Sequence, residues 1–225
     1  TDGAGTVPTT QRTAGKWTGS AAIDTIQIHH QNASANFLTG SEVIVLGFDS
    51  DDTHTDNFWE RIAYKTQTTA AATLTTDTFA AKKYLQVHLW SQNNVSGSYG
   101  GQPEFKVGTG TIDTGSNYAM RINKSNSDDA RASQARFGIW AGTSQGVQSD
   151  WDLFIVNFSG KEKYCVGRGF AANTAGSDSD SWYFSRFSGK WTGSDQITQL
   201  QLTEVDSGQG INVLAGSKIT VWGSD

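Results

Sequence analysis

The sequence predicts an all-β protein, and three features of its composition and patterning support this. Glycine is abundant at 25 residues and proline scarce at 2, while 11 Phe and 8 Trp supply the apolar mass that Leu and Met supply in helical proteins. Short runs with period-two alternation recur between clusters of Gly, Asn, Asp and Ser. No stretch carries a 3.6-residue apolar stripe of helical length. We therefore predict a two-sheet β-sandwich that is jelly-roll-like.

The expected strands are short and are bounded by turn-forming residues. In residues 82–90, Leu85, Val87 and Leu89 share one face of the expected strand. The opposite face is formed by Tyr84, Gln86, His88 and Trp90. The full set of expected strands covers residues 58–65, 70–79, 82–90, 104–108, 117–123, 134–141, 151–158, 162–170, 181–187, 196–204 and 217–223.

Two segments near the ends of the chain repeat each other. Residues 15–28 and 189–202 share the identical hexapeptide Gly-Lys-Trp-Thr-Gly-Ser, and the apolar positions after it also match. The matched pairs are Ile23 with Ile197, Ile26 with Leu200, and Ile28 with Leu202. The match resumes after a loop, where residues 36–47 align with residues 212–223. Only the loop differs in length, which is typical of two strands joined by a tolerant connection.

This repeat predicts how the chain is divided. Residues 57–225 are expected to form a complete β-sandwich domain, residues 1–48 to be the closing strands of another sandwich, and residues 49–56 to be an acidic linker. Two or three strands cannot enclose a core by themselves. Residues 1–48 must therefore be completed by upstream sequence, by residues 57–225, or by strands of a neighbouring subunit. All three routes predict an array or an assembly.

The charge and the hydropathy of the chain exclude two classes of partner. The chain carries 17 Lys and Arg against 22 Asp and Glu, which gives a net charge of −5. This acidic balance argues against a phosphate-binding groove, because nucleic-acid affinity comes mostly from clustered Lys and Arg. No window approaches the roughly 18 apolar residues that span a membrane. We expect neither a nucleic-acid partner nor a membrane partner.

Metal-ligating and nucleophilic residues are present, but their spacing matches no known site. The acidic stretches at residues 49–52 and 178–180 lack the turn glycine and closing Glu of an EF-hand, so solvated loops are the preferred interpretation. His29 and His30 follow a strand and would point to opposite faces. The single cysteine, Cys165, is interpreted as a small buried hydrophobe. We expect no metal and no cofactor.

The sequence also lacks the motifs that identify an enzyme. Paired carboxylates for glycoside hydrolysis would have to come from Glu60, Asp152, Glu162 or Glu204, and nothing local marks any two as a pair. There is no Gly-x-Ser-x-Gly elbow, no P-loop and no dinucleotide glycine motif. We predict that the protein is not an enzyme and has no catalytic, cofactor-binding or metal-binding residues.

The tryptophans allow two interpretations. Most lie inside alternating strands, so core packing is preferred, and exposed sugar-stacking platforms are the alternative. The residues concerned are Trp59, Trp90, Trp140, Trp151, Trp182, Trp191 and Trp222.

The order of the opening and closing strands follows a recurrent pattern. An aromatic strand at residues 58–63 is followed by a Thr/Ala-rich strand at residues 66–76. A closing segment that ends in a Gly-Ser…Gly signature occurs twice, at residues 23–47 and 197–223. With this pattern, residues 57–225 resemble a family of β-sandwich modules from bacteriophage virions. The chain departs from the family where Leu46 and Trp222 replace the usual Tyr before the final glycine.

The resemblance implies a structural or adhesive role on the virion exterior. Members of that family belong to tail fibres, receptor-binding tips or capsid decorations. The implied partners are further copies of the chain in a homo-oligomer, other virion proteins and a host-surface glycan. Two alternatives remain open: a secreted carbohydrate-binding module, indicated by the tryptophan content, and a subunit of an extracellular filament or surface layer in which residues 1–48 complete the next copy.

Overall fold

The computed structural model describes residues 25–28, 37, 58–93, 103–124, 127–138, 148–172, 182–204 and 212–225. The chain divides into two units, and Phe58–Asp225 belong to one of them. In the other unit only residues 25–28 and Phe37 are described, and they are exposed and outside regular structure. The remainder of the predicted closing segment at 1–48 and the predicted linker at 49–56 therefore lie outside the described residues.

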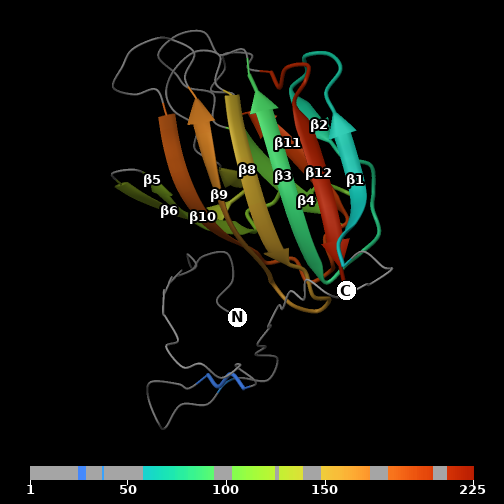
Figure 1. The fold of residues 1–225 in the computed structure, drawn as a ribbon, viewed down its shortest axis with the longest axis vertical. Helices are drawn as coiled ribbons and strands as arrows, with labels where there is room; N and C mark the ends of the chain where they lie inside the picture. The colour runs from blue at the N-terminus through green and yellow to red at the C-terminus, as the bar shows by residue number, and fades with distance from the viewer. Residues whose placement is uncertain are drawn as a thin grey trace, which may run out of the picture. The chain divides into compact units, whose positions relative to one another are not determined.

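The described residues form an all-β fold with no helix, as predicted, and their strands make two antiparallel sheets that pack as a sandwich (Figure 1). Across the larger sheet the strands are β1 (Glu60–Thr66), β12 (Lys218–Ser224), β3 (Tyr84–Gln92), β8 (Gln148–Val156), β9 (Lys163–Ala172), β10 (Trp182–Trp191), β5 (Tyr118–Lys124) and β6 (Ser127–Gln134). Across the smaller sheet they are β2 (Thr73–Thr75), β11 (Gln199–Glu204), β4 (Pro103–Gly108) and β7 (Phe137–Gly138).

Three strand predictions need correction. The expected strand at residues 70–79 was too long, since β2 covers only Thr73–Thr75. The strand β6 was not expected, because its sequence SDDARASQ has no apolar alternation. It forms by pairing with β5 at the edge of the larger sheet. The expected strand at residues 134–141 was too long, since within the described part of this range the strand β7 covers only Phe137–Gly138. A search for apolar alternation does not detect polar edge strands, because neither face of such a strand needs to be apolar.

The core lies between the two sheets. The alternation predicted for residues 82–90 is confirmed in β3, where Leu85, Val87 and Leu89 face the core and are at most 1% exposed. An aromatic cluster fills the space between β7 and the larger sheet: the ring centroid of Phe137 lies 4.8 Å from that of Phe105 and 5.4 Å from that of Phe187. Aromatic pairs at these separations contribute beyond their buried area.

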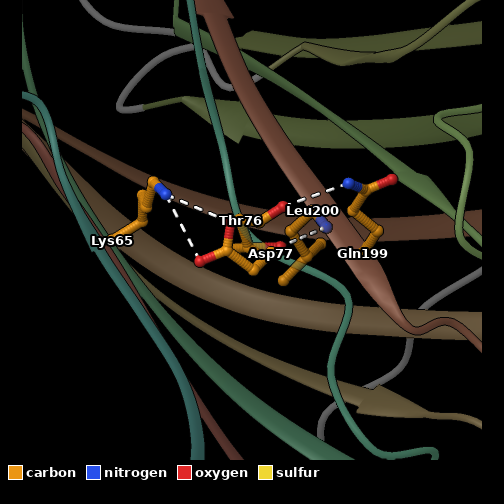
Figure 2. Close-up of polar contacts among 5 residues, drawn as sticks. All are labelled: Lys65, Thr76, Asp77, Gln199 and Leu200. Atoms are coloured by element: carbon orange, nitrogen blue, oxygen red, sulfur yellow. Dashed lines mark hydrogen bonds and ion pairs between the residues drawn. The ribbon is translucent and has the colours of Figure 1, made fainter.

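Polar contacts around Thr76 join the end of β2 to β11 (Figure 2). The Leu200 N–H donates to Thr76 Oγ1 at 3.0 Å, and Gln199 Nε2 donates to the Thr76 carbonyl oxygen at 3.1 Å. Since Thr76 is buried, these bonds satisfy polar atoms that water does not reach. Beside them, Lys65 Nζ of β1 lies 3.1 Å from Asp77 Oδ1, but this pair is largely exposed and contributes little stability.

The outer edges of both sheets are short, irregular or charged. The edge strand β6 carries two Asp and one Arg, and its register with β5 shifts between Tyr118 and Met120. The edge strand β1 shifts register between Arg61 and Ala63. In the smaller sheet, the edge strands β2 and β7 have three and two residues. Charges, bulges and short strands all oppose the addition of a strand from another chain.

Candidate functional site

The repeated Gly-Lys-Trp-Thr-Gly-Ser motif has a structural role in its second copy. The Trp191 ring lies so close to Gly193 that an added Cβ there would be 2.2 Å from the indole. The Lys163 ammonium is buried and donates to the carbonyl oxygens of Gly193 at 3.2 Å and of Ser194 at 2.9 Å. Trp191 Nε1 donates to Asp113 Oδ2. Each partner of the motif lies within the same domain, so the motif stabilises the fold.

The closing Gly-Ser…Gly signature is also structural. Gly216 has φ of +93°, a conformation that other residues rarely adopt. The buried Ser217 hydroxyl accepts a bond from the Gln92 N–H at 3.0 Å and donates to the Gln92 carbonyl oxygen at 3.3 Å. At Gly223 an added Cβ would lie 2.6 Å from Lys82. The signature therefore turns the chain into β12 and ties that turn to the end of β3.

Cys165 is confirmed as a buried hydrophobe. It is 2% exposed within the core cluster, and burial raises the pKa of its thiol well above the ordinary value. Because the thiolate is the nucleophile, such a thiol is unreactive at neutral pH.

The four carboxylates considered for glycoside hydrolysis occupy separate places. Asp152 lies in β8 of the larger sheet, and Glu204 ends β11 in the smaller one. Glu60 begins the edge strand β1. Glu162 lies before β9, where its Oε2 is 3.6 Å from the buried Lys190 Nζ. Nothing in this arrangement brings two of them together as a catalytic pair.

Most residues considered for metal binding lie outside the described residues. They are His29, His30 and the acidic stretches at 49–52 and 178–180. Within the described ranges, no three His, Cys, Asp or Glu side chains gather as metal ligands would. The described part of the chain also has no helix long and apolar enough to cross a membrane.

The tryptophans divide between the core and the outer face. Trp151 and Trp191 are buried at 1% and 5% exposure, which confirms core packing for these two. Trp59, Trp90 and Trp222 are only partly buried. Trp140 lies outside the described residues, and for Trp182 only its place in β10 is described.

The candidate functional site lies on the outer face of the larger sheet, which points away from the smaller sheet. Cross-strand register aligns its side chains in rows that run across β3, β8, β9 and β10. One row is aromatic except for one aspartate, and we call it the aromatic row. It consists of Trp90, Asp150, Phe170 and Phe184. The charged row beside it consists of His88, Asp152, Arg168 and Arg186.

A groove of about 260 Å³ opens between these two rows. Its lining residues are Asp150, Asp152, Arg168, Gly169, Phe170 and Phe184. Phe170 and Phe184 are 40% and 52% exposed, although large apolar side chains usually avoid water. The carboxylate of Asp150 is held by His88, whose Nε2 contacts Asp150 Oδ1.

The backbone beneath the groove is packed closely against the core. On the inner side of β9, an added Cβ at Gly169 would lie 2.2 Å from the Trp151 ring, and one at Gly167 would lie 2.4 Å from Leu153. The β9 backbone therefore rests directly on core side chains. A site placed on packed strands keeps its geometry better than one placed on a loop.

The other end of the same outer face is rich in apolar side chains, and we call these side chains the apolar half. It consists of Trp59, Tyr84, Phe154, Phe158, Tyr164 and Val166. Polar residues lie in the same rows, since Gln86 stands opposite Phe154 and Lys190 stands opposite Tyr164. The Tyr84 and Phe154 rings stack at 6.1 Å, and Trp59 meets Phe154 edge-on at 6.3 Å. Tyr164 and Val166 are 49% and 42% exposed. An exposed apolar cluster of this kind is typical of a contact surface.

Sequence reasoning did not single out Asp150, Arg168, Phe170 or Phe184. A signal was present in β10, where Phe184 and Arg186 are two residues apart and therefore point to the same face of the strand. The residues that follow Phe184 on that face of β10 are polar. An aromatic residue at a polar-face position is a candidate for binding. The groove itself also requires the register between β8, β9 and β10, which no single strand reveals.

The described residues thus form a β-sandwich domain with a small groove on the outer face of its larger sheet. Comparisons with protein-family models, with curated proteins and with solved structures found no match to this chain.

Proposed function

We propose that this protein is a structural and adhesive component of a virion exterior, a capsid decoration or part of a tail fibre, that works as a homo-oligomer. The strand order supports a jelly-roll-like domain, because β1-β12-β3-β8 in one sheet faces β2-β11-β4-β7 in the other. Jelly rolls occur in viral capsid and lectin domains. One fold serves many functions, so the proposal depends mainly on the surface of the domain.

The observation that carries the proposal is the apolar half of the outer face. Its members come from β3, β8 and β9 and from the segments next to β1 and β8. Tyr164 and Val166 are neighbours in β9 on this face and are both substantially exposed. Isolated apolar residues on a surface need no explanation, but a cluster of aromatic and aliphatic side chains favours a role in association.

A second copy of this domain is the partner that we assign to the apolar half. The open sheet edges are bulged, charged or very short, so association through a face is favoured over the exchange of strands. The internal repeat also favours similar modules side by side, because residues 15–47 match residues 189–223 of the described domain. In a symmetric dimer the same patch serves both partners.

The oligomeric state tests this proposal. Sedimentation velocity of the full chain at micromolar concentration should give a mass at least twice that of the 24.2 kDa monomer. The substitution Val166→Lys places a charge in the apolar half and should shift the population to monomer. The matched control Arg186→Lys, on the same face outside the apolar half, should keep the oligomer. A wild-type chain that is monomeric throughout would contradict the proposal.

The virion location has a separate test. Peptides of this chain should co-purify with phage particles through a density gradient and should be removed by surface proteolysis of intact particles. Detection only in the soluble fraction of the culture would contradict the virion assignment.

A further inference from the structure

We propose that the groove between the aromatic and charged rows binds one neutral sugar ring of a surface glycan. This inference rests on the proposed adhesive function and assigns adhesion to a specific place, over β8, β9 and β10. The apolar half of the face is left to association between copies. The two roles therefore use different residues and can be separated by mutation.

Phe170 and Phe184 supply the apolar side of the site. They stand directly opposite each other across β9 and β10. Side chains in such positions have Cβ atoms about 5 Å apart, so the two rings present one apolar surface similar in width to a pyranose ring. The C–H groups on one face of a pyranose are apolar and pack favourably on an aromatic face.

The polar groups of the groove are of mixed charge. Asp150 is in contact with His88, and Asp152 stands opposite Arg168 in the register of β8 and β9. An anion site would present donors alone, and a cation site would present carboxylates and rings without the guanidinium. Carboxylates accept hydrogen bonds and a guanidinium only donates them, whereas each sugar hydroxyl does both. The combination fits a neutral polyhydroxylated ring.

The size of the groove sets how much of the ligand it holds. Sites that enclose drug-sized molecules have volumes of about 300–1,000 Å³. At about 260 Å³ this groove accommodates a single ring. The rest of a glycan would extend over the sheet surface, where Arg186 continues the charged row. Binding of one sugar should accordingly be weak, and several copies in an oligomer would supply avidity.

Saturation-transfer NMR on the full chain tests the inference, because it detects weak ligands of large oligomers. The probes are glucose, galactose, mannose and N-acetylglucosamine, each at millimolar concentration. At least one should receive saturation, most strongly on the C–H protons of one ring face. Absence of transfer to all four overturns the inference. Stronger competition by choline or by glucuronate than by the best neutral sugar also overturns it, because the site would then prefer a charged ligand.

Two variants locate the binding. Phe184→Ala removes one exposed ring and should weaken binding about tenfold, the equivalent of one lost aromatic contact. Val166→Ala, in the apolar half of the same face, is the matched control and should bind as the wild type does. Undiminished binding by Phe184→Ala would overturn the inference, and circular dichroism establishes that both variants fold.

The same variants distinguish this inference from the proposed function. Phe184→Ala should keep the oligomer while it loses the sugar, and Val166→Lys should lose the oligomer while each monomer still binds the sugar. An oligomer that binds no sugar removes only the inference. A monomeric wild-type chain that binds the sugar in this groove removes only the proposed assembly.

Discussion

The indole Nε1 of Trp191 donates a 2.7 Å hydrogen bond to Oδ2 of Asp113. This bond joins the end of β10 to the loop that precedes β5. The same carboxylate accepts bonds from the Asn117 side chain at 2.9 Å and from the Gly115 N–H at 2.8 Å. Asp113 thus organises the loop around the second copy of the repeated tryptophan motif.

Replacing this indole with a ring that has no donor should destabilise the domain. For Trp191→Phe we expect a loss of about 2 kcal/mol, since hydrogen bonds to charged groups contribute about 1.5–3 kcal/mol. Urea unfolding monitored by circular dichroism measures the change. Trp222→Phe, at a half-buried position, is the control and should cost less. Equal losses in the two variants would show that the Asp113 bond contributes nothing specific.

Asp113 should also make stability depend on pH in the acid range. Burial favours its neutral form, but the bonds from Trp191, Asn117 and Gly115 prevail and lower its pKa below the ordinary value of 3.8. A lowered pKa stabilises the fold above pH 3.8, and this contribution is lost as pH falls through the folded value. Unfolding curves measured from pH 7 to pH 2 should show that the wild type has the higher free energy of unfolding at neutral pH. Its difference from Asp113→Asn should shrink as the pH falls. A constant difference between them would contradict this.

Lys163 should produce a slope of the same sign at alkaline pH. Burial lowers its pKa from 10.5 to about 8, with Asp195 acting in the other direction. Between these values the unfolded chain holds a proton that the folded chain has released, so stability should rise with pH from 8 to 10.5. Relative to Lys163→Met, the wild type should gain up to about 3 kcal/mol across this window. Parallel pH profiles of the two proteins would refute the assignment.

Asn157 should tolerate no charge. Its side chain is fully buried, with Nδ2 donating to the carbonyl oxygens of Lys82 at 2.9 Å and Ile197 at 3.2 Å and with Oδ1 accepting from the Ile197 N–H at 2.7 Å. In Asn157→Asp a carboxylate would face two carbonyl oxygens. We expect a loss of about 3 kcal/mol in thermal or urea unfolding. Thr109→Asp introduces the same charge at an exposed position and should change stability little.

The repeat itself can be tested by exchange. In a chimera, residues 189–223 are replaced by residues 15–47. It should fold cooperatively, because the hexapeptide that contacts Asp113 and Lys163 is identical and Ile26 and Ile28 replace the buried Leu200 and Leu202. A molten chimera without near-UV circular dichroism would show that residues 15–47 are not equivalent closing strands. A scrambled version of residues 15–47 at the same place serves as the control.

Much of the fold was predictable because apolar alternation is a property of single strands. The inward residues of β3 follow from the pattern in residues 82–90, and Cys165 was recognisable as a core residue from its own surroundings. The strand β6 was not predictable in this way, since its polar residues become a strand only through pairing with β5. The sequence also suggested structural roles and binding roles for the tryptophans without separating them.

Composition and local pattern by themselves determined that this protein is a β-sandwich, that residues 189–223 repeat residues 15–47, and where most strands lie. Only the tertiary structure decided that Phe170 stands opposite Phe184, that Asp152 stands opposite Arg168, and that these residues line one groove. The physical reason is that alternation along a strand depends on neighbours in sequence, whereas a site on a sheet depends on the register between strands. That register is set by the packing of the whole core.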